Sequence, residues 1–168
     1  MSVTLQKANI FQALEIWEIL QQAILRRKAD GSKQWQDGYP NLAVIKNDIE
    51  KNQGFVLMDD ENIVGYCAIL INNEPEYANL KGEWLSNEDF VVFHRVAIDE
   101  GHLGKGLAKT MMTLIEDFAL ENNIHSIKAD TNFDNVAMLS IFEKLGYAYC
   151  GEVFFRGNAR KAFEKVLN

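Results

Sequence analysis

Three glycines lie close together in the segment Val91–Lys109, where an apolar, strand-like run gives way to a helical pattern. Gly101, Gly104 and Gly106 allow tight turning and close approach of a ligand, because they carry no Cβ. The first turn of a helix presents unpaired N–H groups and the positive end of the helix dipole. The pattern therefore predicts a cradle for a pyrophosphate, with an ordinary exposed loop as the alternative.

Two common nucleotide-binding motifs fit this loop poorly. A Walker-type loop continues with Lys and then Ser or Thr after its last glycine, whereas Leu107 and Ala108 follow Gly106. A dinucleotide fingerprint has the spacing GxGxxG in the first βα unit of its domain, whereas this chain has GxxGxG far along the sequence. A nucleotide-binding enzyme is therefore a distant alternative.

Two ordered motifs resemble those of the GNAT superfamily of acetyl-CoA-dependent N-acetyltransferases. The run Leu103-Gly104-Lys105-Gly106-Leu107-Ala108 resembles its motif A, Gln/Arg-x-x-Gly-x-Gly/Ala, with Leu103 at the position of the usual Gln or Arg. The segment Asn135–Tyr147 then resembles the family pattern that begins with Asn and ends in Tyr-Glu-Lys-Leu-Gly-Phe. Two motifs at an appropriate separation are far more specific than either alone, and the resemblance covers nearly the whole chain.

The resemblance implies a fold and a cofactor. The fold class is α/β (α+β mixed), with a central mixed, mostly antiparallel sheet flanked by helices in the order β-α-α-β-β-β-α-β-α-β-β. The cofactor is acetyl-CoA, whose pantetheine arm lies where the strand before the glycine loop and the strand after its helix splay apart. The implied binding groups are the backbone of Val96 and Ile98 for this arm, the backbone N–H groups of Leu103, Gly104, Lys105, Gly106, Leu107 and Ala108 for the pyrophosphate, and Asn135. For Asn135, capping of the following helix is the alternative.

The catalytic groups are less clear from the sequence. Phe142 stands where the family often has a tyrosine that protonates the leaving thiolate, and phenylalanine has no proton to give. His94 interrupts an apolar strand beside the expected cofactor groove, and we expect it either to accept the amine proton or to belong to a structural hydrogen-bond network. Arg95 should face the opposite side and pair with a carboxylate, such as an internal structural one.

Two segments could border an acceptor amine. The long connection Asn72–Phe90 combines several acidic residues with aromatic ones, which suits an ammonium group through charge and cation–π contact. The segment Trp35–Pro40 occupies the region that borders the acceptor pocket in relatives. The residues expected to bind the acceptor are Trp35, Tyr39, Glu74, Tyr77, Glu83 and Trp84, and a solvated surface loop is the alternative.

Composition restricts the remaining possibilities. The chain has 168 residues, which favours one domain spanning 1–168, and its formal net charge of −7 argues against nucleic acid as a main partner. It has only two cysteines, Cys67 and Cys150, so a disulfide framework is not expected and a reducing cytoplasm fits. We identify no signal peptide, no apolar run long enough to span a bilayer and no metal-binding pattern. A homodimer is possible by family resemblance.

Periodicity places the elements that must position these residues. We expect strands at Val3–Lys7, Gly54–Met58, Ile63–Ile71, Val91–Ile98, Ile127–Thr131, Tyr147–Phe155 and Lys161–Leu167. We expect helices over Ile10–Ile24 with Asn9 as cap, from Pro40 to about Lys51, after the glycine loop through Phe118, and over Asn135–Leu145. Arg26–Tyr39 is polar and rich in turn residues.

The first functional hypothesis is an N-acetyltransferase that moves an acetyl group from acetyl-CoA directly to a primary amine in a ternary complex. The amine is either a small cationic molecule or an exposed amino group of a peptide. The alternative is a catalytically weak CoA-binding or regulatory module, which the phenylalanine at position 142 supports.

Overall fold

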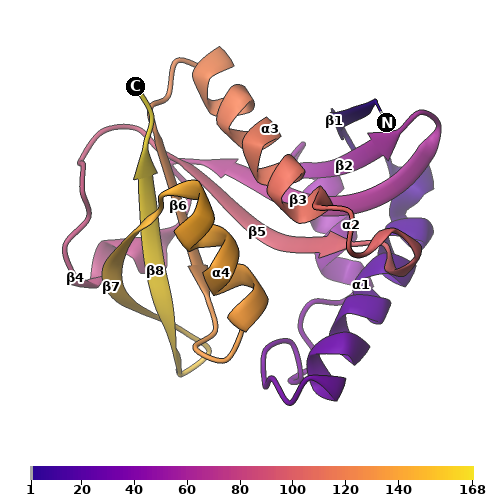
Figure 1. The fold of residues 1–168 in the computed structure, drawn as a ribbon, viewed down its shortest axis with the longest axis horizontal. Coiled ribbons are helices and arrows are strands. Elements are labelled where there is room, and N and C mark those ends of the chain that lie inside the picture. Colours follow the sequence, from indigo (N-terminus) through magenta and orange to yellow (C-terminus); the bar gives the residue numbers. More distant parts are fainter. Residues whose placement is uncertain (1) are drawn as a thin grey trace. The chain divides into compact units, whose positions relative to one another are not determined.

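The computed structural model describes residues 2–168, which contain the helices and strands of Figure 1. The strands are β1 (Val3–Lys7), β2 (Gly54–Asp59), β3 (Asn62–Ile71), β4 (Lys81–Gly82), β5 (Val91–Ile98), β6 (Ser126–Thr131), β7 (Ala148–Phe155) and β8 (Asn158–Val166). The helices are α1 (Ala13–Ala29), α2 (Leu42–Glu50), α3 (Leu107–Glu121) and α4 (Val136–Leu145), with short 3₁₀ turns η1 (Ile10–Gln12), η2 (Pro75–Asn79) and η3 (Glu100–His102). The hydrogen-bonded strand order is β1-β2-β3-β5-β6-β8-β7-β4.

The chain divides into two compact units. One consists of the chain up to Ile69 together with Arg95–Ile115, and the other of Leu70–His94 together with Glu116–Asn168. Strand β5 and helix α3 each continue from one unit into the other. A single domain over 1–168 stays a prediction.

In the first unit, two helices cover an antiparallel meander. Strand β1 pairs with β2, and β2 forms a hairpin with β3 across a two-residue turn after Asp59. Helix α1 contributes Ile16 and Leu20 to the core, α2 contributes Ile45, and Val56 of β2 packs against them. Full burial of each such aliphatic side chain contributes roughly 2 kcal/mol, so this packing sets the position of both helices.

The other side of this meander accepts helix α3. A Cβ on Gly65 of β3 would lie 2.8 Å from Cε of Met111 on α3 and 3.0 Å from Cδ1 of Ile98 on β5. The glycine therefore allows α3 to approach the strand closely. Because α3 begins directly after the glycine loop, this contact also fixes the position of the loop.

In the second unit, helix α4 covers one face of a sheet formed by the first residues of β5 and by β6, β8, β7 and β4 (Figure 1). Phe142 of α4 is fully buried, and its ring lies 4.6 Å from that of Phe163 on β8 and 6.3 Å from that of Phe93 on β5. The parallel pairing of β5 with β6 joins Val91 to Ile127 and Val92 to Lys128, whereas β5 continues to Ile98.

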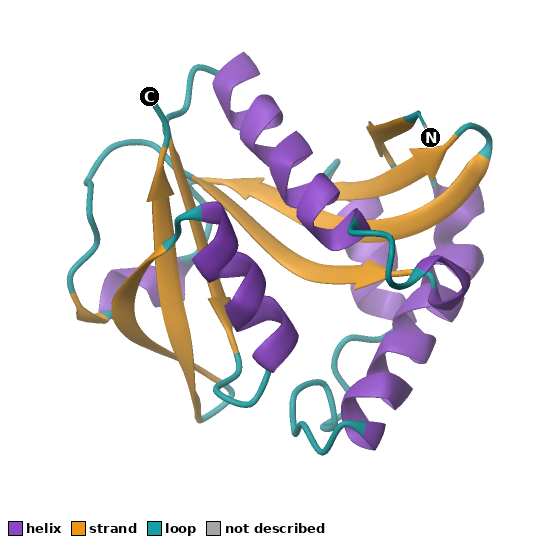
Figure 2. Ribbon diagram, viewed as in Figure 1, coloured by secondary structure: helices purple, strands orange, loops and turns teal. Residues whose placement is uncertain are grey.

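The opposite face of this sheet is covered by the connection between β3 and β5, which is mostly loop in Figure 2. Its residues Tyr77 and Trp84 pack against Val92, Val153 and Ala162 of the strands. The ends of the connection are joined to each other, because the Asn72 backbone N–H donates to the Phe90 carbonyl at 3.0 Å and the Asn72 Oδ1 accepts from the Phe90 N–H at 2.9 Å. The connection is therefore a closed, packed loop.

The expected order of elements is confirmed, with one addition. Strand β4 was not expected; it pairs with β7 where two glycines meet, since a Cβ on Gly82 would lie 2.0 Å from the Cys150 carbonyl oxygen. Helix α1 runs to Ala29, five residues beyond its expected end, because Arg26, Arg27 and Lys28 favour the last turn of a helix through its dipole. Strand β8 begins at Asn158, three residues before its expected start at Lys161, and ends at Val166.

Candidate functional site

The glycine loop lies in the first unit, between β5 and α3. Residues 103–106 are exposed and lead directly into Leu107, the first residue of α3. Gly104 and Gly106 have φ angles of +78° and +71°, and a Cβ at either position would meet no atom within 4 Å. The N–H groups at the start of α3 have no acceptor within the helix. The loop thus offers exposed backbone donors and open space above them, which fits a pyrophosphate.

The chain before the loop is held in place by side chains. The Asp99 Oδ2 accepts from the Gly101 N–H at 3.2 Å and lies 2.8 Å from Nδ1 of His102, while the Glu100 N–H donates to Gln22 at 3.1 Å. Val96 and Ile98, which were expected to hold a pantetheine arm, are buried in β5. The Ile98 carbonyl accepts a hydrogen bond from Nη2 of Arg26 at 3.0 Å.

Arg95 has the internal partner that the sequence suggested. Its Nε and Nη2 donate to the two carboxylate oxygens of Asp48 on α2 at 2.9 and 2.6 Å, and its Nη1 donates to the Tyr39 hydroxyl at 2.5 Å. Tyr66 donates to the same carboxylate at 2.7 Å. Burial alone would lower the pKa of Arg95, but Tyr39 and Asp48 outweigh it and hold this pKa above its usual value. Arg95 is therefore a fixed charge with a structural task.

The backbone at Arg95 has an unusual conformation. Its φ is +58°, in the left-handed region that costs a residue with a side chain of order 1 kcal/mol or more. The bidentate ion pair with Asp48 offsets this cost. Of the two expected acceptor residues in this unit, Tyr39 belongs to the same cluster, and Trp35 is buried with its ring under the guanidinium of Arg27 at 3.7 Å.

His94 lies in a polar network of the second unit. Its Nε2 is 2.7 Å from Oε2 of Glu74, and its Nδ1 is 3.9 Å from Oδ1 of Asp130 on β6. Asp130 in turn accepts from the Tyr77 hydroxyl at 2.5 Å and pairs with Nε of Arg160 at 2.5 Å. A carboxylate can only accept a hydrogen bond, so the Glu74 contact fits an imidazole that carries a proton on Nε2. His94 is thus oriented by a carboxylate, the arrangement that a general base would need.

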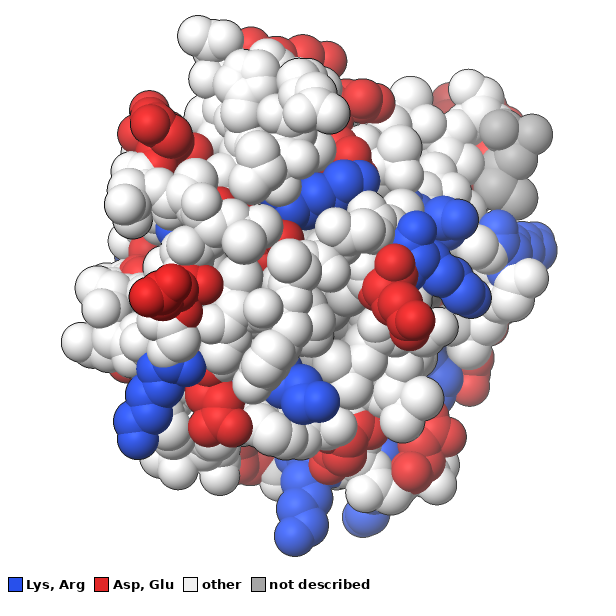
Figure 3. Space-filling view, turned by 60° about the vertical axis from the view of Figure 1, so that its left-hand side comes forward, with Lys and Arg blue, Asp and Glu red and all other residues white. Residues whose placement is uncertain are grey.

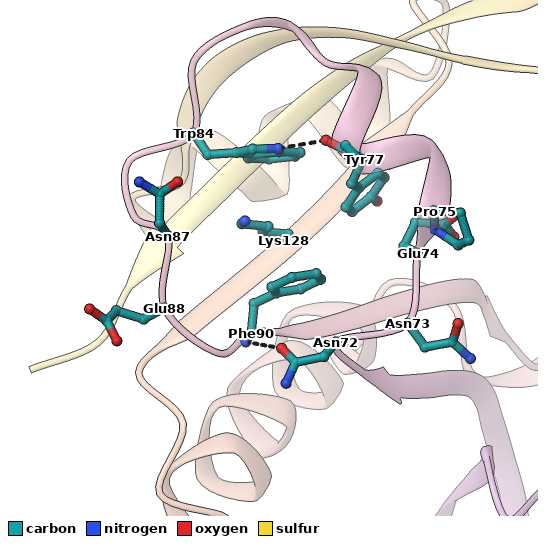
Figure 4. A pocket seen from close by; sticks show the side chains of 11 residues that line it. Asn72, Asn73, Glu74, Pro75, Tyr77, Trp84, Asn87, Glu88, Phe90 and Lys128 are labelled. Carbon is teal, nitrogen blue, oxygen red and sulfur yellow. Dashed lines mark hydrogen bonds between the residues drawn. The ribbon is translucent and has the colours of Figure 1, made fainter.

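A cavity of about 410 Å³ opens next to this network (Figure 4). Three of the expected acceptor residues, Glu74, Tyr77 and Trp84, line it, whereas Glu83 does not. Glu83 is exposed, and its backbone N–H extends the pairing of β4 by donating to the Cys150 carbonyl at 3.0 Å. Glu74 faces both the cavity and His94, so it connects the candidate base to a space that a small molecule can enter.

Asn135 and Phe142 have clear structural tasks. The Asn135 Oδ1 accepts from the Met138 N–H at 3.1 Å and so caps helix α4. Phe142 is enclosed by other aromatic rings, including that of Tyr147 at 5.0 Å. Burial raises the pKa of Tyr147, whose hydroxyl has no hydrogen-bond partner among the described residues. The aromatic residues of the family pattern are thus exchanged: phenylalanine stands at 142 and tyrosine at 147.

Residues 2–168 contain no cluster of three or more His, Cys, Asp or Glu that could hold a metal ion, and no helix among them is long and apolar enough to cross a bilayer. Cys67 and Cys150 are free and buried, and burial raises the pKa of both thiols, which makes them poor nucleophiles. On the face drawn in Figure 3, acidic and basic side chains are interspersed, without a continuous basic field.

The sequence did not predict a role for four polar residues of the second unit: Lys128, Asp130, Arg160 and Glu164. The signal was present in β6, where Lys128 and Asp130 alternate with Ile127 and Ala129. Such alternation is normally interpreted as one solvent-facing side of a strand. Here the polar side lies instead under the connection between β3 and β5, which no local pattern reveals.

Comparisons with known proteins give a consistent result. The sequence matches the family described as "Acetyltransferase (GNAT) family" over residues 15–147. A GNAT-family acetyltransferase from Streptococcus agalactiae 2603 is 32% identical and superposes with a TM-score of 0.91, over 99% of this chain and 96% of its own. An acetyltransferase from Salmonella typhimurium, solved with its cofactor acetyl-CoA, is 17% identical with a TM-score of 0.70, over 100% and 95% of the two chains. This second likeness concerns the fold alone.

Curated relatives match over shorter stretches. N-acetyltransferase 8B of Homo sapiens is 24% identical over 106 residues, which are 63% of this chain and 43% of that protein. N-acetylaspartate synthetase of Xenopus tropicalis is 33% identical over 69 residues, 40% of this chain and 26% of that protein. The chain therefore spans less than half of the length of these relatives. The match over residues 15–147, the fold and the two sequence motifs agree that the chain belongs to the GNAT family of acetyltransferases.

Proposed function

We propose that this protein is an acetyl-CoA-dependent N-acetyltransferase that acetylates a primary amine by direct transfer in a ternary complex. The observation that carries the proposal is the exposed loop 103–106 at the start of α3, with its two glycines at positive φ, in a chain of the GNAT family. Backbone N–H groups of residues 103–108 would bind the pyrophosphate, and Val96 and Ile98 would bind the pantetheine arm. Bound acetyl-CoA supplies an activated thioester.

The chain's own residues would prepare the amine. An incoming ammonium group must lose a proton before nitrogen can attack a carbonyl carbon. Nδ1 of His94 accepts this proton, and Glu74, 2.7 Å from Nε2, orients the ring and stabilises the imidazolium that forms. An acyl-enzyme on cysteine is disfavoured, because Cys67 and Cys150 are both buried with raised pKa values.

Position 142 offers no side chain that could protonate the leaving thiolate. Phe142 is fully buried among aromatic rings and has no acidic proton. A water molecule can serve as the acid, and a fairly acidic thiol also leaves without assistance. The same observation favours the second candidate function, a CoA-binding module with weak catalysis or a regulatory role.

Turnover measurements separate the two functions. The purified chain is incubated with acetyl-CoA and a panel of amines that includes polyamines, aminoglycosides, amino acids and peptides, and release of free CoA is measured. Binding of CoA is measured separately by calorimetry. The enzyme hypothesis expects turnover with at least one class of amine. Tight CoA binding with no acetylation of any amine would favour the module instead.

A further inference from the structure

A buried lysine lies at the centre of the cavity between the β3–β5 connection and β6. Lys128 is 4% exposed, and its Nζ lies 4.5 Å from the ring centre of Trp84 and 4.2 Å from that of Phe90 (Figure 4). Both rings belong to the connection that covers this face of the second unit. The ammonium group is therefore held between two aromatic faces and directed into a space of about 410 Å³.

The natural partner of Lys128 is already occupied. Glu164 of β8 is directly opposite Lys128 in the register of β6 and β8, on the same face of the sheet. However, its carboxylate accepts from the Leu85 N–H at 2.7 Å, from the Ser86 hydroxyl at 2.8 Å and from the Ser126 hydroxyl at 2.6 Å. Glu164 thus fastens the connection to the sheet. It interacts with Lys128 as a nearby negative charge and not through a hydrogen bond.

The donors of Lys128 are consequently unused. Among residues 2–168, no oxygen accepts a hydrogen bond from its Nζ or lies within ion-pair distance, and its close contacts are the two rings. Burial lowers the pKa of Lys128, whereas Glu164 acts in the opposite direction. The Nζ borders the cavity, so its N–H groups are available to a ligand that enters there. Attraction to the two ring faces stabilises the ammonium group but does not use these donors.

The cavity is connected to the candidate base through one residue, Glu74, which lines the cavity and bonds to His94. Lys128 and Asp130 lie two residues apart on one face of β6, a separation of about 7 Å. The other acidic residue of the lining, Glu88, is drawn with its carboxylate pointing away from Lys128 (Figure 4). One small molecule can therefore contact Glu74 through an amine and Lys128 through an anionic group.

We propose that this cavity selects small acceptors that carry an anionic group, a carboxylate or a phosphate, in addition to the amine, and that Lys128 binds this group. This inference rests on the proposed function, because the kinetic test described next requires acetyl transfer. Trp84 and Phe90 hold the lysine in place and exclude water from the ion pair, and Tyr77 closes the side next to Asp130. Glu74 thus serves the amine end of the acceptor, and Lys128 serves the opposite end.

The test compares small primary amines that carry a carboxylate, a phosphate or no anionic group. The probes are γ-aminobutyrate, 2-aminoethyl phosphate and butylamine, each assayed with acetyl-CoA and the wild-type chain. We expect a KM at least tenfold lower for one or both anionic amines than for butylamine. If γ-aminobutyrate gains and the phosphate does not, the group is a carboxylate, and the reverse result identifies a phosphate.

Substitution of the lysine gives the decisive comparison. Lys128→Met should raise the KM for the preferred anionic amine at least tenfold and leave that for butylamine within twofold, and Lys128→Arg should retain most of the preference. Lys81→Met is the matched control, because the Lys81 Nζ also lies over an aromatic ring, that of Phe154 at 4.9 Å, but outside the cavity. Equal changes for both amines, or no preference in the wild-type chain, would overturn the proposal.

A binding measurement separates this proposal from the proposed function. Titration of γ-aminobutyrate or 2-aminoethyl phosphate without acetyl-CoA is followed by the fluorescence of Trp84, in a chain with the other two tryptophans changed to phenylalanine. A saturable change that Lys128→Met abolishes supports the anion site even if no amine is acetylated. If amines are acetylated but neither anion perturbs Trp84, the anion site is refuted and the acetyltransferase function stands.

Discussion

At the scale of single residues, the glycine loop shows how a missing side chain can matter in two ways. A residue with a Cβ at 104 or 106 would be strained by the positive φ and would also fill the space above the exposed backbone donors. The sequence motif singles out Gly106, at its glycine position. The structure adds Gly104 through its positive φ, whereas Gly101 has no positive φ and its Cβ would meet only Oδ2 of Asp99, at 3.2 Å.

Gly106→Val should abolish CoA binding, because it closes the approach to the N–H groups at the start of α3. CoA affinity is measured by calorimetry, with circular dichroism to verify folding. Gly157→Val is the matched control: Gly157 has a φ of +78° and similarly open surroundings, but it lies in the turn between β7 and β8. If both variants bind CoA equally well, the pyrophosphate site at this loop is refuted.

The histidine gives a second prediction at this scale. His94→Gln should lower kcat by about 100-fold, the usual size of a general-base contribution, and should remove the acidic limb of the pH–rate profile. The expectation follows because a general base acts only when its accepting nitrogen is unprotonated. His125→Gln serves as control, since Nδ1 of His125 lies 3.3 Å from the Leu167 carbonyl oxygen and the residue is outside the His94–Glu74 network. A wild-type kcat and pH profile in His94→Gln would leave His94 a structural residue.

At the scale of elements, patterns along the chain predicted most helices and strands but few of their contacts. Asn135 and Gly146 are recognisable as the cap and the stop of α4, because capping is a local interaction. The partners of His94, Arg95 and Lys128 could not be predicted in this way. Asp48 lies 47 residues from Arg95 and is brought to it by the packing of helix α2, whereas Glu164 lies 36 residues from Lys128 and is brought to it by the register of β6 and β8.

The ion pair between α2 and β5 yields a prediction about stability. Asp48→Asn should lower the free energy of unfolding by about 3 kcal/mol, because it leaves a buried guanidinium without its countercharge and removes the support for the left-handed backbone at Arg95. Urea unfolding followed by circular dichroism measures the change. Glu50→Gln, on the same helix but exposed, should change stability by less than about 0.5 kcal/mol. Equal stabilities of the two variants would contradict a structural role for the pair.

At the scale of the whole molecule, the question is whether two compact units make one folding domain. Strand β5 and helix α3 each pass from one unit to the other, so neither unit can unfold without disrupting an element of its neighbour. We therefore expect a single cooperative transition. The sequence supported this prediction only through chain length, because no composition break marks a boundary between residues 69 and 95.

Tryptophan fluorescence can test this expectation unit by unit. Trp17 and Trp35 lie in the first unit and Trp84 in the second, so two variants that retain tryptophan in only one unit report on the units separately. Their urea midpoints should coincide within error after correction for the substitutions, and far-ultraviolet circular dichroism should follow the same curve. Two well-separated midpoints would show that the units unfold independently.

The carboxylate of Glu164 has a consequence for how members of this family could be re-engineered. It accepts hydrogen bonds from Leu85 and Ser86 of the connection although it lies near residue 168. The Ser126 hydroxyl, from a third part of the chain, donates to the same carboxylate. A recognition loop is often treated as a cassette that can be exchanged between relatives. In this protein the cassette is not contiguous: a transplanted 72–90 segment would keep its shape only if the residues at 126 and 164 were transferred with it.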